Sequence, residues 1–245
     1  MIQELLLFLK RPRFRPTPSS LNQKFRRLLV CLGLYFLVII TLGLFITLYN
    51  KLLITQLNLD FAVRIKKNFQ NVTGGSNLKM FILLVLLGPV IEELLFRGWF
   101  NFKKAFIALA TAILFMFILA GVSGTSFYTQ PIDGSFWTRV VISVAAGAIV
   151  HLLGPTSQLK ALGRQHFSKF YYGSSTIFAL VHLANYIPLS PLEFLLSLPL
   201  ITPQLSLGLL FGYIRVKNGL FWSIALHITV NYIPFLFTFS ASMGG

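Results

Sequence analysis

The sequence predicts an all-α fold, a polytopic membrane bundle of seven to eight transmembrane helices, and composition and apolar patterning carry that prediction. The chain of 245 residues is 56% hydrophobic and only 11% charged, whereas about a quarter of the residues in a soluble domain are charged. Its mean hydropathy is +0.76, and its long apolar runs approach the roughly 20 residues that a helix needs to cross a bilayer. Composition therefore excludes a soluble globular protein.

The apolar runs predict seven spans, separated by short polar segments. By residue number these spans are 28–49, 79–100, 103–121, 137–154, 170–187, 193–214 and 219–240. We divide the chain into a basic cytosolic tail (1–27), a first transmembrane helix with its polar loop (28–77) and a membrane core (78–240). The tail opens with MIQELLLFL, which we expect to lie along the interface. The loop at 50–78 forms either an interfacial helix or an eighth membrane segment.

The placement of charge predicts the orientation and the partners. The net charge of +15 could indicate nucleic acid, but Lys and Arg gather in the tail and in short loops, which is typical of topology signals facing an anionic leaflet. With the N-terminus in the cytosol, most of the 21 basic residues are cytosolic, and the loops 122–136 and 188–192 have none. We expect an integral, multi-pass protein of a bacterial inner membrane or a plastid or thylakoid-type membrane, with no nucleic-acid partner.

Glu92 and Glu93 are two of only six acidic residues, and they stand inside the apolar segment LKMFILLVLLGPVIEELLFRGWF (78–100). A charge at membrane depth costs roughly 2.5 to 3.5 kcal/mol or more, so it marks a functional site by default. Neighbours on a helix diverge by about 100°. We expect Glu93 to pair with Arg97, four residues on, and Arg97 to reach toward the cytosolic interface. That leaves Glu92 as a candidate general base.

Three further polar residues interrupt apolar helices: His182, His227 and Asn231. Counting from the predicted cytosolic boundaries at 1.5 Å per residue places Glu92, His182 and His227 at a similar depth, about 15 to 20 Å from that boundary. His227 and Asn231 are four residues apart, share a helix face and could donate hydrogen bonds to an oxyanion. The alternative is an incidental network in which each histidine merely joins two helices.

Prolines predict breaks close to these residues. Pro89 precedes the acidic doublet by one turn, and Pro199 and Pro203 interrupt the sixth span. Proline removes a backbone donor and bends a helix, and a membrane tolerates the freed carbonyls only against protein or a water-filled cavity. Each break therefore indicates either a packing kink or the edge of a polar site.

Three motifs resemble those of the CAAX protease and bacteriocin-processing family, also called the CPBP or Abi family. EELLFRG (92–98), FALVH (178–182) and HITVN (227–231) are similar to its Glu-Glu-x-x-x-Arg, Phe-x-x-x-His and His-x-x-x-Asn motifs, and the Gly-rich run before the last histidine is also in place. The resemblance covers roughly residues 78–240. It implies an intramembrane endopeptidase related to the type II CAAX prenyl endopeptidase, in which Glu92 and His182 activate water while His227 and Asn231 stabilise the oxyanion.

The resemblance also implies a peptide or lipidated protein substrate, cleaved near the cytosolic face. Metalloendopeptidase activity in the family is disputed. Two histidines and a glutamate could supply a catalytic zinc shell, but the sequence has no His-Glu-x-x-His. We therefore expect no cofactor, with zinc as the alternative.

Two non-protease functions compete with this prediction. One is a non-catalytic membrane adaptor or bacteriocin-immunity-type protein of the same fold. The other is a transporter or proton relay built on the buried Glu and His residues. Many transporters contain internal repeats, and the two halves of this chain show none.

Overall fold

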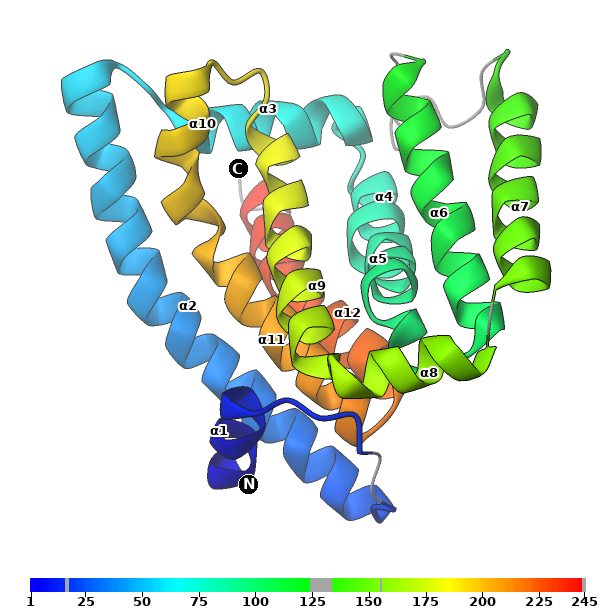
Figure 1. Cartoon of the computed structure of the whole chain (residues 1–245). Coiled ribbons are helices and arrows are strands. Elements are labelled where there is room, and N and C mark those ends of the chain that lie inside the picture. The colour runs from blue at the N-terminus through cyan, green and yellow to red at the C-terminus, as the bar shows by residue number, and fades with distance from the viewer. Residues whose placement is uncertain (16–17, 124–133, 155, 244–245) are drawn as a thin grey trace.

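The structure, a computed structural model, describes residues 1–15, 18–123, 134–154 and 156–243. Within these ranges every regular element is a helix (Figure 1), which confirms the all-α fold class. Residues 124–133 of the predicted loop at 122–136 lie outside the described residues. The helices in chain order are α1 (Ile2–Lys10), α2 (Leu21–Leu57), α3 (Phe61–Thr73), α4 (Asn77–Met80), η1 (Phe81–Leu87), α5 (Gly88–Phe96), η2 (Gly98–Asn101), α6 (Lys104–Val122), α7 (Phe136–Leu153), α8 (Thr156–Gln165), α9 (Phe167–Val181), η3 (His182–Tyr186), α10 (Pro191–Ser197), η4 (Leu198–Ile201), α11 (Thr202–Lys217) and α12 (Leu220–Met243).

All seven predicted spans coincide with helical segments. In the described part of the chain, four helical stretches are long and apolar enough to cross a membrane: Leu21–Leu57, Lys104–Val122, Phe136–Leu153 and Pro191–Lys217. A shorter apolar helix covers Leu220–Leu236. The chain is therefore an integral membrane protein.

The basic loop at 50–78 contains α3, which Figure 1 shows lying across one end of the bundle. Asp60 caps its first turn by accepting from the backbone amides of Ala62 and Val63. Arg64 Nη1 donates to the Pro188 carbonyl at 2.9 Å, which ties α3 to the loop before α10. The 13 residues of α3 measure about 20 Å, less than the roughly 30 Å hydrocarbon layer. At this length α3 is too short to be an eighth membrane segment, and the interfacial position of the loop stays a prediction.

Both proline breaks appear as departures from regular α-helix. Before Pro89, η1 is a π-helix that runs directly into α5. Around Pro199, the short 3-10 helix η4 separates α10 from α11. Irregular turns such as these leave carbonyls outside the usual i to i−4 ladder, so each break offers backbone groups to neighbouring side chains.

Close packing of α9 against α11 depends on two glycines of the Gly-rich run. A Cβ on Gly212 would lie 2.6 Å from the ring of Tyr171, and one on Gly208 would lie 3.2 Å from Ser175. Tyr171 also donates its hydroxyl to the Leu209 carbonyl at 2.6 Å. The absence of side chains at these two positions lets α9 and α11 approach closely, which brings the FALVH segment against the centre of the bundle.

The N-terminal helix α1 packs its apolar face on the protein. Leu5 and Phe8 are 2% and 7% exposed, and the Phe8 ring lies 5.3 Å from the rings of both Tyr171 and Tyr213. Figure 1 places α1 beside the first turns of α2 and near the end of α11. The opening segment of the tail is therefore part of the folded core.

Candidate active site

Glu93 is fully buried, and both of its carboxylate oxygens are bound. Oε1 accepts a hydrogen bond from Arg97 Nη1 at 2.7 Å and lies 3.1 Å from His227 Nδ1. Ser223 donates its hydroxyl to Oε2. The ion pair expected from the spacing of Glu93 and Arg97 is present, and α12 adds two further partners. Glu93 thereby joins α5 to α12.

Arg97 does not extend toward the interface, and that expectation was wrong. Its side chain is fully buried, its guanidinium carbon lies 4.1 Å from the ring centroid of Phe178, and Nη2 is 3.5 Å from the Gly208 carbonyl. An aromatic face attracts a cation most strongly where water is excluded. Partners on α9 and α11, together with Glu93, hold the side chain inside the bundle.

His227 lies between the two glutamates and is only 3% exposed. Its ring stacks on Phe211, with centroids 4.3 Å apart and 24° between the planes. While Nδ1 faces Glu93, Nε2 lies 3.6 Å from Glu92 Oε2. That separation exceeds the usual 2.7 to 3.2 Å of an N–H···O hydrogen bond. His227 is therefore anchored on one side by Glu93 and close to Glu92 on the other.

Glu92 differs from its neighbour in having no tight partner. Its side chain is 24% exposed, and within the described residues its buried Oε2 has no hydrogen-bond donor. A buried carboxylate oxygen without a donor is unfavourable. Glu93 is therefore fully hydrogen-bonded, whereas Oε2 of Glu92 can still accept a hydrogen bond.

His182 stands where α9 ends and the 3-10 turn η3 begins. Its Nδ1 lies 2.7 Å from the Phe178 carbonyl, so Nδ1 carries the proton and donates. In a neutral ring Nε2 is then an acceptor. The Phe178 ring centroid lies 4.8 Å from the His182 ring and 5.8 Å from the His227 ring. The first and last residues of FALVH therefore lie beside the same centre as His227.

Asn231 contacts the irregular helix that precedes the doublet. Its Nδ2 donates to the Leu84 carbonyl at 2.9 Å, and Leu84 belongs to the π-helix η1. This bond uses one of the two amide hydrogens and leaves the other for a ligand. A role for Asn231 at an oxyanion stays a prediction.

Sequence reasoning missed Ser223 and misjudged Arg215. Ser223 is four residues before His227 on α12, so helical spacing alone could have placed it on the same face. Arg215 was taken as a cytosolic loop charge, yet it is only 7% exposed. Its Nε and Nη2 donate to the Arg97 and Gly98 carbonyls at 2.9 and 3.0 Å, a contact with no signal in the sequence.

Comparison with known proteins now identifies the family. The family model described as type II CAAX prenyl endopeptidase Rce1-like matches residues 74–233, well over half of the chain. This chain belongs to that family. No curated protein and no solved structure matches the chain significantly. The matched range contains all three motifs, confirms the resemblance noted in the sequence, and makes the chain a member of a family of intramembrane endopeptidases.

A catalytic zinc would need about three histidine, cysteine or carboxylate ligands gathered at one point of this Rce1-like chain. In the described ranges, no group of three or more His, Cys, Asp or Glu side chains is arranged to hold a metal ion. Both ring nitrogens of His227 face carboxylates, and Nδ1 of His182 is bound to a carbonyl. The side chains as placed do not fit a three-ligand zinc site.

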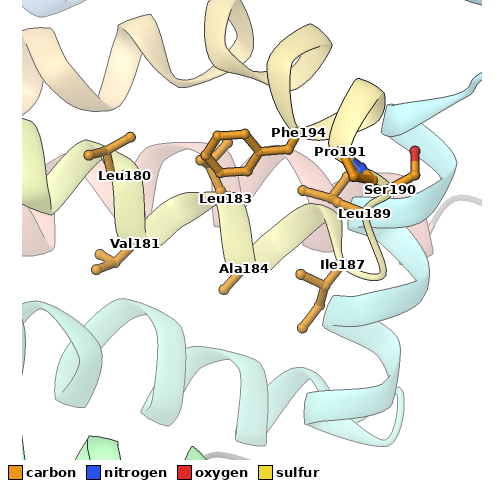
Figure 2. A pocket seen from close by; sticks show the side chains of 9 residues that line it. All are labelled: Leu180, Val181, Leu183, Ala184, Ile187, Leu189, Ser190, Pro191 and Phe194. Atoms are coloured by element: carbon orange, nitrogen blue, oxygen red, sulfur yellow. The ribbon is translucent and has the colours of Figure 1, made fainter.

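An apolar groove lies along the turn that carries His182 in this Rce1-like chain. Figure 2 shows side chains from the end of α9, from η3 and from the start of α10 surrounding an open cavity of about 650 Å³. Two of its lining residues, Leu183 and Ala184, belong to the same 3-10 turn as His182. The groove therefore runs past the turn that carries the second-motif histidine. Its full lining is Leu180, Val181, Leu183, Ala184, Ile187, Leu189, Ser190, Pro191 and Phe194.

Proposed function

We propose that this family member is a glutamate-type endopeptidase that hydrolyses a peptide bond within the membrane, near the cytosolic face, with Glu92 as the general base. One observation carries the proposal: Glu92 presents a buried oxygen with no donor among the described residues, 3.6 Å from His227 Nε2. The adjacent Glu93 is bound on both oxygens. Of the two glutamates, Glu92 is thus the one available to take a proton.

Glu92 and His182 would prepare the water for attack. Glu92 accepts one proton from the water, and His182, with its proton held at Nδ1 by Phe178, accepts a hydrogen bond at Nε2 from the other O–H. The water oxygen then forms a bond to the carbonyl carbon of the substrate. General-base assistance of this kind contributes about 10²- to 10⁴-fold to rate.

His227 and Asn231 would stabilise the tetrahedral oxyanion. Glu93 fixes the His227 ring through Nδ1 and leaves Nε2–H to donate when the ring is protonated. Asn231 has one amide hydrogen left after binding Leu84. Preorganised donors in a dry site are worth several kcal/mol to such a transition state. The carbon–nitrogen bond then breaks and Glu92 gives its proton to the leaving amine. The products are an amine and a carboxylic acid, which loses its remaining proton to solvent.

The substrate we propose is a lipidated peptide or protein. The family is named for prenyl endopeptidases, and the groove in Figure 2 supplies an apolar channel beside the His182 turn. Apolar pockets with few polar groups suit a chain of hydrocarbon size. In this arrangement the lipid lies along η3 and α10, while the peptide extends from it toward Glu92.

A matched pair of substitutions tests the proposed function. A farnesylated CAAX peptide with a fluorophore and a quencher across the scissile bond would be incubated with purified protein in detergent. Glu92→Gln keeps the shape of the side chain and removes the base, so we expect kcat to fall by at least about 100-fold with the melting temperature unchanged.

Ser206→Ala on α11 serves as the control, because the Ser206 hydroxyl donates to the Thr202 carbonyl of its own helix and to no other described residue. Full activity of Glu92→Gln would contradict the proposed mechanism. A wild-type protein that binds the peptide without cleaving it would favour the adaptor or immunity-type function instead.

A further inference from the structure

Gln204 is a polar residue of the membrane interior that the proposed mechanism leaves unused. It follows Pro203 directly, in the first turn of α11, just after the η4 break. On a helix, positions i, i+4, i+7 and i+11 form one stripe, and for Gln204 these are Gly208, Phe211 and Arg215. The Gly208 carbonyl lies against Arg97, and Phe211 stacks on His227. Gln204 therefore lies on the face of α11 that forms the site.

Helix register places Gln204 beside the second-motif histidine. Gly212 lies against Tyr171 and Gly208 against Ser175, so α9 and α11 run antiparallel and advance together by four residues. One more step of four places Gln204 opposite Ala179, about one turn from His182.

Register with α12 places Gln204 at the level of Asn231. Ser223 donates to the Phe211 carbonyl at 3.0 Å, and the Phe211 ring stacks on His227. Continuing this antiparallel pairing by two turns brings the start of α11 level with residues 230–231. Gln204 therefore shares its depth with two residues of the proposed site.

The side-chain oxygen of Gln204 needs a hydrogen-bond donor. Oε1 is buried, and no described residue donates to it. An amide oxygen accepts hydrogen bonds and donates none, and a buried acceptor without a partner is costly. Glu92 Oε2 has the same lack of a donor. Two such acceptors, one on α5 and one on the site-forming face of α11, match a ligand that brings N–H or O–H groups.

We propose that Gln204 binds the backbone of the peptide substrate, with Oε1 accepting a hydrogen bond from one of its amide N–H groups. The inference rests on the proposed function and names a contact for the same site. Gln204 lies seven residues, or about 10 Å, along α11 from Phe211, and an extended peptide spans about 3.3 Å per residue. The N–H that Gln204 binds is therefore no more than about three residues from the scissile bond.

Binding measurements in a Glu92→Gln background test this contact without requiring turnover. The probe is the farnesylated CAAX peptide, together with analogues that are N-methylated at one amide at a time. We expect Gln204→Leu to weaken binding of the parent peptide by up to about tenfold, the scale of one hydrogen bond. One N-methyl analogue should bind the Glu92→Gln protein more weakly than the parent peptide does, by the same factor. In the Gln204→Leu protein, this analogue and the parent peptide should bind with equal affinity. Ser206→Ala should bind every analogue as the background protein does.

Melting temperature separates this role from a structural one. Since Leu removes a buried acceptor that has no partner, Gln204→Leu should be at least as stable as its parent. A clear loss of melting temperature, or an N-methyl pattern that Gln204→Leu leaves unchanged, would overturn the inference. If the protein binds the peptide with this pattern but never cleaves it, the proposed function fails and the Gln204 contact stands. A peptide that the protein neither binds nor cleaves overturns both.

Discussion

Glu92 and Glu93 are adjacent on α5, yet their surroundings differ because neighbouring residues on a helix face different partners. Glu93 faces α12 and its own Arg97, which together bind both oxygens. Glu92 faces His227, whose Nε2 lies 3.6 Å from Glu92 Oε2. A buried charge is tolerated when it is paired and hydrogen-bonded, so Glu93 supports the fold while Glu92 stays available for chemistry.

Glu93→Gln should destabilise the protein strongly. It removes the carboxylate that neutralises the fully buried Arg97, and breaking one partner of a buried pair costs about 3 to 5 kcal/mol. At roughly 2 to 4 °C per kcal/mol for a chain of this size, the melting temperature in detergent should fall by about 6 to 20 °C. Glu92→Gln is the matched control, since it changes the neighbouring carboxylate without unpairing Arg97. Equal melting temperatures for the two variants would contradict the stabilising role of the Glu93–Arg97 pair.

At the residue scale, the sequence predicted pairs within one helix but not contacts between helices. The spacing of Glu93 and Arg97 determines their contact, because i and i+4 share a face. The bonds from His227 and Ser223 to Glu93 depend on the register of α12 against α5, which no local pattern encodes. Depth counting placed His182 and His227 at one level, and the structure brings both rings against Phe178.

The C-terminal end of α5 is held by Arg215 on α11. A helix ends with backbone carbonyls that lack partners, and a cation there is favoured by the helix dipole. Arg215 donates to the Arg97 and Gly98 carbonyls just beyond the end of α5. This contact fixes the position of the last turn and therefore of the helix that carries Glu92.

Arg215→Met should reduce catalysis more than substrate binding. The apolar side chain leaves two carbonyls without donors and lets the end of α5 shift, and small displacements of a catalytic group can cost up to about 100-fold in rate. We expect kcat on the farnesylated peptide to fall about 10- to 100-fold while KM changes by less than about threefold. Arg215→Lys, which retains the charge, should recover part of kcat.

Lys160→Met, on the exposed side of α8, removes a charge without touching α5 and should leave kcat unchanged. A kcat for Arg215→Met equal to that of Lys160→Met would show that Arg215 does not position α5.

At the element scale, the apolar runs predicted the positions of the helices along the chain. They did not predict which type of helix (α, π or 3-10) forms at each position. The prolines at 89, 199 and 203 indicated breaks, and the structure has a π-helix before the first and a 3-10 helix at the second. Which kind of turn forms depends on tertiary partners such as Asn231, which binds the Leu84 carbonyl. The family match covers residues 74–233, so the shape of α1 to α3 had to come from the structure.

Over the whole molecule, α1 closes one end of the bundle by joining the beginning of α2 to the end of α11. Glu4 binds Arg27 through two hydrogen bonds of 3.2 and 3.3 Å and lies 3.3 Å from Lys217 Nζ. Arg27 also reaches the Asn218 side chain at 3.3 Å. The sequence predicted an amphipathic segment at the start of the chain. Its apolar face would suit either a bilayer interface or the surface of the bundle, so the apolar pattern alone did not show which of the two it contacts. Only the charges around Glu4 distinguish the two.

Docking of α1 should weaken in acid through Glu4. Partial burial raises the pKa of this carboxyl, but the Arg27 and Lys217 charges outweigh that effect and hold the pKa below its ordinary value of 4.5. A group whose pKa is lower in the folded state stabilises the fold at pH values above its unfolded pKa, and this stabilisation is lost as pH falls through the folded pKa. The melting temperature of the wild type should therefore exceed that of Glu4→Gln at pH 7, and the difference should shrink below about pH 4.5.

Arg13→Gln changes a residue of the same tail away from Glu4, so its difference in melting temperature from the wild type should not change with pH in this way. If the gap between wild type and Glu4→Gln is constant from pH 7 to pH 3.5, the ion pairs of Glu4 do not hold α1 on the bundle, and its apolar contacts through Leu5 and Phe8 suffice.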